Sequence, residues 1–221
     1  MSVQKQDAPS VKVAIPGVSG VGKSTLFEKL IRKEKARHIF VFDHKDGDLS
    51  RRFGAKPCYT PEELMDAVER GGFIIFNPGH MFPGEPEKGF AFFCEWVWAV
   101  GKLIKGKKIF CGDELDDLLD DRKPFCVILD QGRTFEFVCI FICQSMNALH
   151  NQVRKQFTEI FAFRQGDARG TVWLVEKGFD EETLLKLENG LWIYKNMNTG
   201  SMQNGGSAFK PKNSGRNLSG L

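Results

Sequence analysis

Apolar residues along the chain gather into short continuous runs separated by polar segments. Three such runs cover 11–17, 39–42 and 73–76, and they lack the alternation typical of a strand with one face in water. Between the first two, apolar residues over 23–34 recur at helical spacing. Continuous apolar strands that alternate with helices are typical of a parallel sheet covered on both faces. The pattern therefore predicts an α/β fold.

A capped helix is well marked directly before the third apolar run. Thr60 has the side chain of an N-cap residue, Pro61 suits the first turn, and Glu63 completes a capping box. Gly71 and Gly72 then end the helical pattern. These signals support the alternation of strands and helices.

The second half of the chain continues with longer apolar runs. Segment 90–104 has 15 residues and includes Glu95 and Lys102, whereas a membrane span needs about 20 apolar residues. We therefore expect a buried amphipathic helix there and no transmembrane segment. Strands are expected within 107–114, 135–144, 159–164, 171–175 and 191–194. The segments 159–164 and 171–175 are expected to form a β-hairpin, and a capped helix is expected within 180–190.

These elements predict a single domain over residues 11–199. Its expected architecture is a mainly parallel sheet with helices on both faces and a C-terminal β-hairpin. Residues 1–10 are polar without the apolar core of a signal peptide, and we expect a flexible N-terminus. Residues 200–221 are rich in Gly, Ser and Asn, and we expect a disordered basic tail.

The positive charge of the chain lies in that tail. The net charge is +3, and residues 200–221 contain Lys210, Lys212 and Arg216 but no acidic residue. The preceding residues are therefore formally neutral. A neutral body excludes a domain-wide basic surface for nucleic acid, so any DNA contact must come from a local patch or an assembled ring.

The six cysteines are scattered through the chain, mostly within apolar runs, and form no CxxC pair. Cys139 and Cys143 lie four residues apart on one expected strand, which is too far for a disulfide. The four histidines are also dispersed, so no zinc site is predicted. Cysteines used as small buried residues indicate a reducing, cytoplasmic environment.

A glycine-rich motif stands between the first expected strand and helix. Gly17, Gly22, Lys23 and Ser24 match the pattern G-x-x-x-x-G-K-[ST]. The glycines let backbone N–H groups surround phosphates, Lys23 neutralises them, and the Ser24 hydroxyl ligates Mg²⁺. The motif predicts a P-loop NTPase that binds ATP and Mg²⁺. Its expected nucleotide contacts are Gly17, Val18, Ser19, Gly20, Val21, Gly22, Lys23, Ser24 and Thr25.

Asp113 and Asp130 are alternative candidates for the Walker B residue of the expected ATPase. Asp113 ends an apolar run and is followed by Glu114. Asp113 can hold the Mg²⁺ shell as a Walker B residue, while Glu114 can activate a water for attack on the γ-phosphate. Asp130 also ends an apolar run, but no Glu follows it. The nearby acidic cluster is expected to be a solvated helix face, and comprises Asp116, Asp117, Asp120 and Asp121.

Two further polar residues flank the apolar run of the strand expected within 135–144. Gln144 follows that run, where a neighbouring parallel strand would bring its amide to the γ-phosphate and the attacking water. Arg133 precedes the run and could act as an arginine finger supplied to a neighbouring subunit. Arg164 and Arg169 are weaker candidates for that role, and an ordinary surface arginine remains an alternative at each position.

The blocks GVSGVGKST, IFVFDHKDGDL, IFCGDEL and GRTFEFVCIFICQS have the order and spacing of the FtsK–HerA superfamily of DNA-pumping ATPases. The resemblance covers roughly residues 11–164. It places Asp43 after the second strand, Glu114 after the Walker B residue, Gln144 as a sensor and Arg133 before the sensor strand.

The short chain is most similar within that superfamily to the genome-packaging ATPases of tailless icosahedral viruses with an internal membrane. This resemblance implies a motor that drives double-stranded DNA of any sequence into a preformed capsid. It implies a ring, expected to be a hexamer, with DNA through its centre and capsid or portal-vertex proteins as partners. Such a motor would work in the host cytoplasm and in the virion.

Other functions remain open. A filamentous-phage-type assembly ATPase shares the P-loop but normally carries a membrane span. A nucleotide-dependent switch or DNA-binding adaptor would hydrolyse ATP without translocating DNA. A small-molecule kinase would normally bring an Arg-rich lid, and no such stretch is visible. The Pro/Gly-rich segment 77–89 is an open candidate for the DNA grip.

Overall fold

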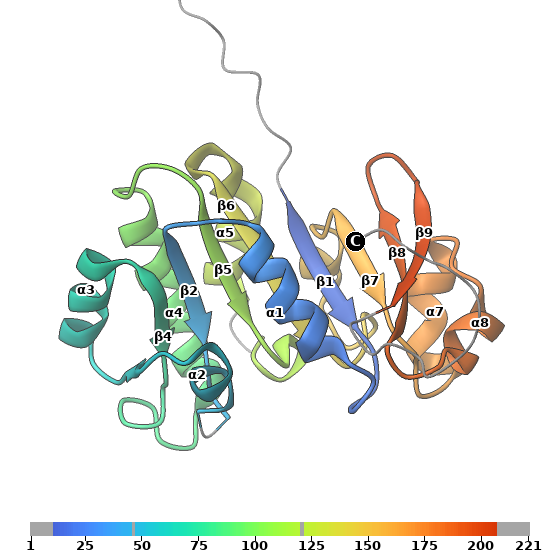
Figure 1. Cartoon of the computed structure of the whole chain (residues 1–221), viewed down its shortest axis with the longest axis horizontal. Coiled ribbons are helices and arrows are strands. Elements are labelled where there is room, and N and C mark those ends of the chain that lie inside the picture. Colours follow the sequence, from blue (N-terminus) through green and yellow to red (C-terminus); the bar gives the residue numbers. More distant parts are fainter. Residues whose placement is uncertain (1–10, 46, 120–121, 207–221) are drawn as a thin grey trace, which may run out of the picture.

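A computed structural model describes residues 11–45, 47–119 and 122–206, and it contains a nine-stranded sheet in the order β3-β4-β2-β5-β6-β1-β7-β8-β9 (Figure 1). All pairings from β3 to β7 are parallel, whereas β8 pairs antiparallel with β7 and β9 with β8. The predicted α/β fold with a mainly parallel sheet is confirmed. The strands are β1 (Lys12–Pro16), β2 (His38–Phe42), β3 (Pro57–Cys58), β4 (Gly72–Phe76), β5 (Lys108–Gly112), β6 (Phe137–Cys143), β7 (Glu159–Ala162), β8 (Leu191–Asn196) and β9 (Met202–Gly206).

Helices cover both faces of the sheet and divide the core into two clusters. On one face, α1 and α2 pack on aliphatic strand residues such as Ile15 and Val41. On the other face, α3 to α8 pack on a larger and more aromatic cluster, and Figure 1 shows α4 and α5 behind the sheet from α1. The helices are α1 (Lys23–Lys33), α2 (Asp48–Phe53), α3 (Pro61–Arg70), α4 (Pro86–Gly101), α5 (Lys123–Gln131), α6 (Asn151–Arg154), α7 (Ala168–Glu176) and α8 (Glu181–Lys186).

Several expectations from the sequence are confirmed in detail. The side chain of Thr60 caps α3 and forms the expected capping box with Glu63. The aromatic run near residue 90 forms α4, which begins earlier than expected at Pro86, so the end of segment 77–89 is helical. All six cysteines are free thiols. Among the described residues, no helix is long and apolar enough to cross a membrane.

The predicted strand at 171–175 is wrong, because these residues lie in α7. Asp167 begins this helix by accepting a hydrogen bond from the backbone N–H of Gly170 at 2.8 Å. Trp173 and Leu174 then face the core, whereas Val172 is exposed. Periodicity does not distinguish a helix from a strand in an apolar run of this length. The C-terminal hairpin exists, but β8 and β9 form it.

The predicted start of the disordered tail, residue 200, is also too early in the chain. Residues 202–206 form β9, which extends the sheet beyond β8. Gly205 is required there, because a Cβ atom at this position would lie 2.3 Å from the Trp192 ring. Residues 207–221 and 1–10 lie outside the described part of the chain.

Replacing Phe90 with alanine should lower the free energy of unfolding by about 3–5 kcal/mol. The Phe90 ring is fully buried and lies 5.1 Å from the Phe42 ring and 5.4 Å from the Phe125 ring, between centroids. Its removal leaves a cavity that these stiff rings cannot fill. Urea unfolding measures the effect, with Leu103→Ala at an 84% exposed position as the control. Equal effects of the two changes would contradict this account of the core.

Candidate active site

The P-loop connects β1 to α1 at the edge of the sheet where the parallel strands end (Figure 1). We call this the carboxyl edge. Strands β1, β5 and β6 are in register, with Pro16 beside Cys143 and Gly112 beside Phe141. Residues that follow these strands therefore converge. They surround a cavity of about 320 Å³, here called the P-loop cavity, lined by Ser19, Gly20, Gly22, Lys23, Ser24, Thr25, Arg52, Asp113, Glu114, Ile142, Cys143 and Gln144.

The first glycine of the motif is required by packing against the segment that follows β7. A Cβ atom on Gly17 would lie 2.7 Å from the Phe163 Cβ atom. The Gly17 N–H donates to the Cys143 carbonyl at 3.2 Å, and the Val18 N–H donates to the Arg164 carbonyl at 3.0 Å. The start of the loop is therefore bound to the ends of both neighbouring strands. Gly17, Val18 and Val21 hold the loop in place but do not line the cavity.

The end of the loop turns directly into α1. Gly22 is the N-cap residue and has φ 104°, a left-handed conformation that favours glycine. Ser24 and Thr25 follow in the first turn, so backbone N–H groups and hydroxyls gather at the helix N-terminus. Such a terminus attracts anions through its free N–H groups and its dipole.

Lys23 folds back over the loop. Its ammonium donates to the carbonyls of Gly17 at 2.5 Å and Val18 at 2.8 Å. Burial lowers the pKa of Lys23, although Asp113, Asp116 and Glu114 act in the opposite direction. A phosphate oxygen is a stronger partner for an ammonium than a neutral carbonyl. The cavity thus contains a desolvated cation suited to a bound phosphate.

Asp113 follows β5 and lines the cavity opposite the P-loop. Its Oδ1 atom accepts the Glu114 backbone N–H at 2.8 Å, and burial raises the pKa of its carboxyl group. Asp130, the alternative Walker B position, lies in helix α5 and is not among the cavity residues. Ser24 and Asp113 offer two oxygen ligands, the kind that Mg²⁺ binds together with nucleotide phosphates. These side chains therefore fit a magnesium ion.

Gln144 follows β6 and also lines the cavity. Its backbone N–H donates to both carboxylate oxygens of Asp116, at 3.1 and 3.0 Å. Asp116 was expected on a solvated helix face, but burial raises the pKa of its carboxyl group and it binds the end of β6. The turn after β5 and the end of β6 are thus joined by a hydrogen-bonded contact.

Asp43 has a structural role that explains its place after β2. Its side chain is 1% exposed, and Oδ2 accepts the Ser50 backbone N–H at 2.8 Å and the Ser50 hydroxyl at 2.7 Å. These bonds hold α2 against the end of β2. Asp43 itself is not among the residues that line the P-loop cavity.

Arg52 was missed by sequence reasoning. It lies on α2 and lines the P-loop cavity. Its Nε atom is buried without a hydrogen-bond partner among the described residues, and its Nη2 atom lies 4.0 Å from Asp48. A buried donor of this kind can bind an anion in the cavity. No local pattern indicates it, because its position depends on how α2 folds back over the loop.

The candidate arginine fingers lie in different places. Arg133 belongs to the 3₁₀ helix Gly132–Phe135, which precedes β6. β6 has seven residues and so is roughly 20 Å long, and Arg133 lies at the opposite end from Gln144. It therefore does not reach the P-loop cavity of its own chain. Arg164 lies beside the P-loop, and Arg169 is exposed on α7.

Comparisons with known proteins identify the fold. The chain is similar to the genome-packaging NTPase B204 of Sulfolobus turreted icosahedral virus 2 in complex with sulfate, with a TM-score of 0.69 and 16% identity over 89% of this chain and 96% of that one. The fold is that of a P-loop ATPase. The expected likeness to packaging ATPases is thus confirmed for the architecture.

Two further solved structures show the same fold. VirB4 of Thermoanaerobacter pseudethanolicus has a TM-score of 0.63 and 12% identity over 90% of this chain and 89% of that one. EssC (ATPases 2 and 3) of Geobacillus thermodenitrificans has a TM-score of 0.55 and 12% identity over 88% of this chain and 39% of that one. No protein-family model matches the sequence. No curated protein matches it either.

Replacing Lys23 with alanine should weaken binding of a non-hydrolysable ATP analogue by about 10–100-fold, because a charge-assisted hydrogen bond contributes about 1.5–3 kcal/mol. Isothermal titration calorimetry with Mg²⁺ present measures this change. Lys29→Ala is the matched control, since Lys29 is exposed on the same helix. If both variants bound the analogue as wild type does, the P-loop cavity would not be the phosphate site.

Proposed function

We propose that this chain is an ATP-driven motor that moves double-stranded DNA into a preformed viral capsid. The observation that carries the proposal is the convergence of Lys23, Asp113, Glu114 and Gln144 on the P-loop cavity. They are the groups needed to bind a nucleoside triphosphate, hold Mg²⁺, activate water and detect the terminal phosphate. The likeness to B204 along nearly its whole length supports the packaging role.

Hydrolysis would use the residues of the cavity in distinct roles. The P-loop N–H groups and Lys23 bind the phosphates, while Ser24 and Asp113 hold Mg²⁺, which neutralises charge on the phosphate oxygens when bound. Glu114 orients the attacking water and accepts its proton. Gln144 contacts the γ-phosphate, and its link to Asp116 passes a change there to the turn after β5.

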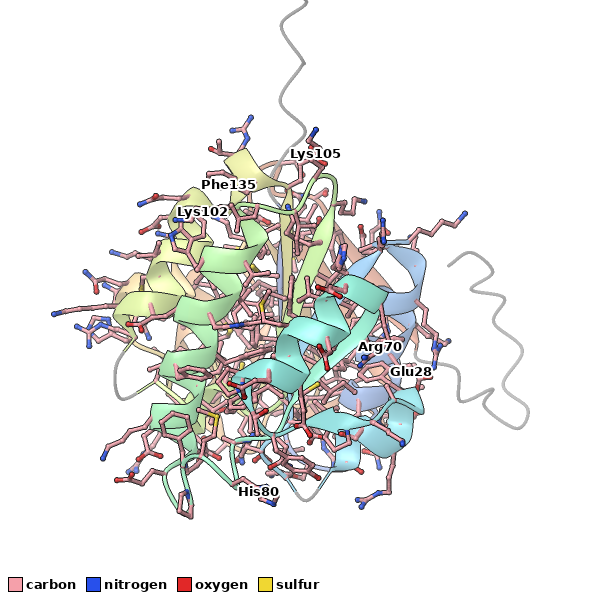
Figure 2. All side chains as sticks on the ribbon, turned by 90° about the vertical axis from the view of Figure 1, so that its left-hand side faces the viewer. Glu28, Arg70, His80, Lys102, Lys105 and Phe135 are labelled. Carbon is pink, nitrogen blue, oxygen red and sulfur yellow. The ribbon has the colours of Figure 1, made fainter. Side chains whose placement is uncertain are left out.

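Arg133 would complete the site of a neighbouring subunit in a ring. It lies at the amino edge of the sheet, where the parallel strands begin. Lys105 and Lys107 precede β5 at the same edge, and Figure 2 shows Lys102, Lys105 and Phe135 at one end of the molecule and His80 at the other. Lys107 is paired with Glu34 of its own chain, so Arg133 and Lys105 are the groups that would face the phosphates bound at the carboxyl edge of the next subunit. Head-to-tail contacts of this kind form a ring when the rotation between neighbouring subunits closes.

The remaining parts of the proposal follow from the packaging role. The ring is proposed to be a hexamer with DNA through its centre, gripped by its phosphates because a packaging motor must move any sequence. Capsid or portal-vertex proteins would dock it, and it would act in the host cytoplasm and in the virion.

Long double-stranded DNA should stimulate steady-state ATP hydrolysis, and Glu114→Gln should reduce the rate by about 100-fold or more, because general base catalysis contributes about 10²–10⁴-fold. Phosphate release with and without DNA measures both effects. Glu182→Gln is the control, since this side chain is 75% exposed on α8. Hydrolysis indifferent to DNA at every protein concentration would favour a switch or adaptor. Full activity of Glu114→Gln would overturn the catalytic assignment.

Arg133→Ala should lose about 1,000-fold or more in DNA-stimulated turnover, as expected for an arginine finger. Mixing this inactive variant with inactive Glu114→Gln should restore activity, because some sites then combine an intact Glu114 with an Arg133 from the neighbour. Random 1:1 mixing into rings would complete about a quarter of the sites.

The same mixture made with Arg164→Ala separates the two candidates. If Arg164 were the finger, Arg133→Ala alone would keep its activity, whereas Arg164→Ala alone would be inactive and would recover activity when mixed with Glu114→Gln. If Arg133 acted only within its own chain, its mixture with Glu114→Gln would stay inactive.

A further inference from the structure

The P-loop cavity contains a cation that comes from neither the P-loop nor a strand end. Arg52 lines the cavity from α2. Its Nε atom is buried and has no hydrogen-bond partner among the described residues. Its Nη2 atom lies 4.0 Å from the Asp48 carboxylate, at the limit of an ion pair, and the side chain as a whole is 31% exposed. A buried donor without a partner is unfavourable, and an acceptor atom within the cavity would satisfy it.

Helix α2 is fixed on the body of the protein, so the arginine that it carries has a defined position. The Asp43 carboxylate at the end of β2 accepts two hydrogen bonds from Ser50. The Phe53 ring stacks on Phe73 of β4 at 4.5 Å and lies 6.2 Å from the Phe27 ring of α1, between centroids. The helix is thus held by β2, by β4 and by the helix that follows the P-loop.

The topology of the sheet decides which part of a nucleotide lies near Arg52. β2 is the neighbour of β5, with Phe42 beside Gly112, whereas β7 lies on the far side of β1. Because α2 follows β2, Arg52 enters the cavity from the side of Asp113. The proposed function places Mg²⁺ and the attacking water at Asp113 and Glu114, and the terminal phosphate is the part of a nucleotide that lies between them.

The two cations of the cavity approach from different directions. Lys23 belongs to the P-loop and lies against the carbonyls of Gly17 and Val18, so it binds phosphate oxygens close to the loop. Arg52 is the other lysine or arginine among the lining residues. Its planar guanidinium can donate two parallel hydrogen bonds to one phosphate group. A terminal phosphate has more free oxygens for such a pair of bonds than a bridging phosphate has.

We propose that Arg52 binds the terminal phosphate of the nucleotide and makes the P-loop cavity prefer a nucleoside triphosphate to a diphosphate. This inference rests on the proposed function, since it takes the P-loop cavity as the nucleotide site. It adds a phosphate ligand from outside the P-loop. Hydrolysis and phosphate release would remove the acceptor of Arg52, so the contact between α2 and the nucleotide would weaken within the same chain.

Arg52→Met removes the charge and the donors while keeping a long side chain. It should weaken binding of a non-hydrolysable ATP analogue by about 10–100-fold, the range for a lost charge-assisted hydrogen bond. Binding of ADP should stay within about twofold of wild type, which also shows that the variant folds. Isothermal titration calorimetry with Mg²⁺ and without DNA measures both affinities.

Arg51→Met is the matched control, because Arg51 is on the same helix with a 70% exposed side chain and is not among the cavity residues. It should bind both nucleotides as wild type does. An unchanged affinity of Arg52→Met for the analogue, or equal weakening of the analogue and ADP, would overturn the proposal.

A second measurement uses the wild-type protein. Phenylglyoxal modifies accessible arginines, and mass spectrometry after limited treatment reports the extent at each site. Mg²⁺ with the ATP analogue should protect Arg52 several-fold, Mg²⁺ with ADP should not, and Arg51 should be modified equally in both samples. Equal modification of Arg52 with the analogue and with ADP would contradict binding to the terminal phosphate.

The failure of this inference is distinguishable from the failure of the proposed function. Both measurements omit DNA and hydrolysis, so ATP hydrolysis indifferent to DNA would remove the motor but leave the Arg52 comparison decisive. Wild-type binding of the analogue by Lys23→Ala would show that the P-loop cavity is not the phosphate site, and this inference would fall with it.

Discussion

The structure depends on the parallel register of β1, β5 and β6. Pairing of Pro16 with Cys143 and of Gly112 with Phe141 brings the ends of three strands to one level. The P-loop, the Asp113-Glu114 pair and Gln144 each follow one of these strands, so a single pattern of backbone hydrogen bonds assembles a cavity from segments far apart in the sequence. The sheet therefore positions the site, because each of these segments begins at the end of one of its strands.

Much of this arrangement could be predicted because its signals are local. The glycine motif implies a loop between a strand and a helix, the capping box at Thr60 marks α3, and an acidic pair after an apolar run marks a strand end. The rest depends on tertiary contacts. The run at Thr171 could have been a strand or a helix until its packing was known, Asp116 became half-buried by binding the end of β6, and Arg52 entered the cavity through the fold of α2.

The P-loop cavity and the proposed arginine finger lie at opposite edges of the sheet. The P-loop cavity occupies the carboxyl edge, while Arg133 lies at the amino edge, a full strand length away. In the proposed ring, each site would be the joint product of two chains.

The hydrophobic cores on the two faces of the sheet differ in size and in aromatic content. The face that carries α4 and α5 is filled with interlocked aromatic rings such as Phe90, Phe110 and Phe141, which resist small shifts because each ring is confined by others. The face beneath α1 and α2 is smaller and mostly aliphatic, and these two helices carry the P-loop and Arg52. Strain that arises at the phosphates would therefore reach this smaller, mostly aliphatic core before the aromatic one, because α1 and α2 pack directly on it.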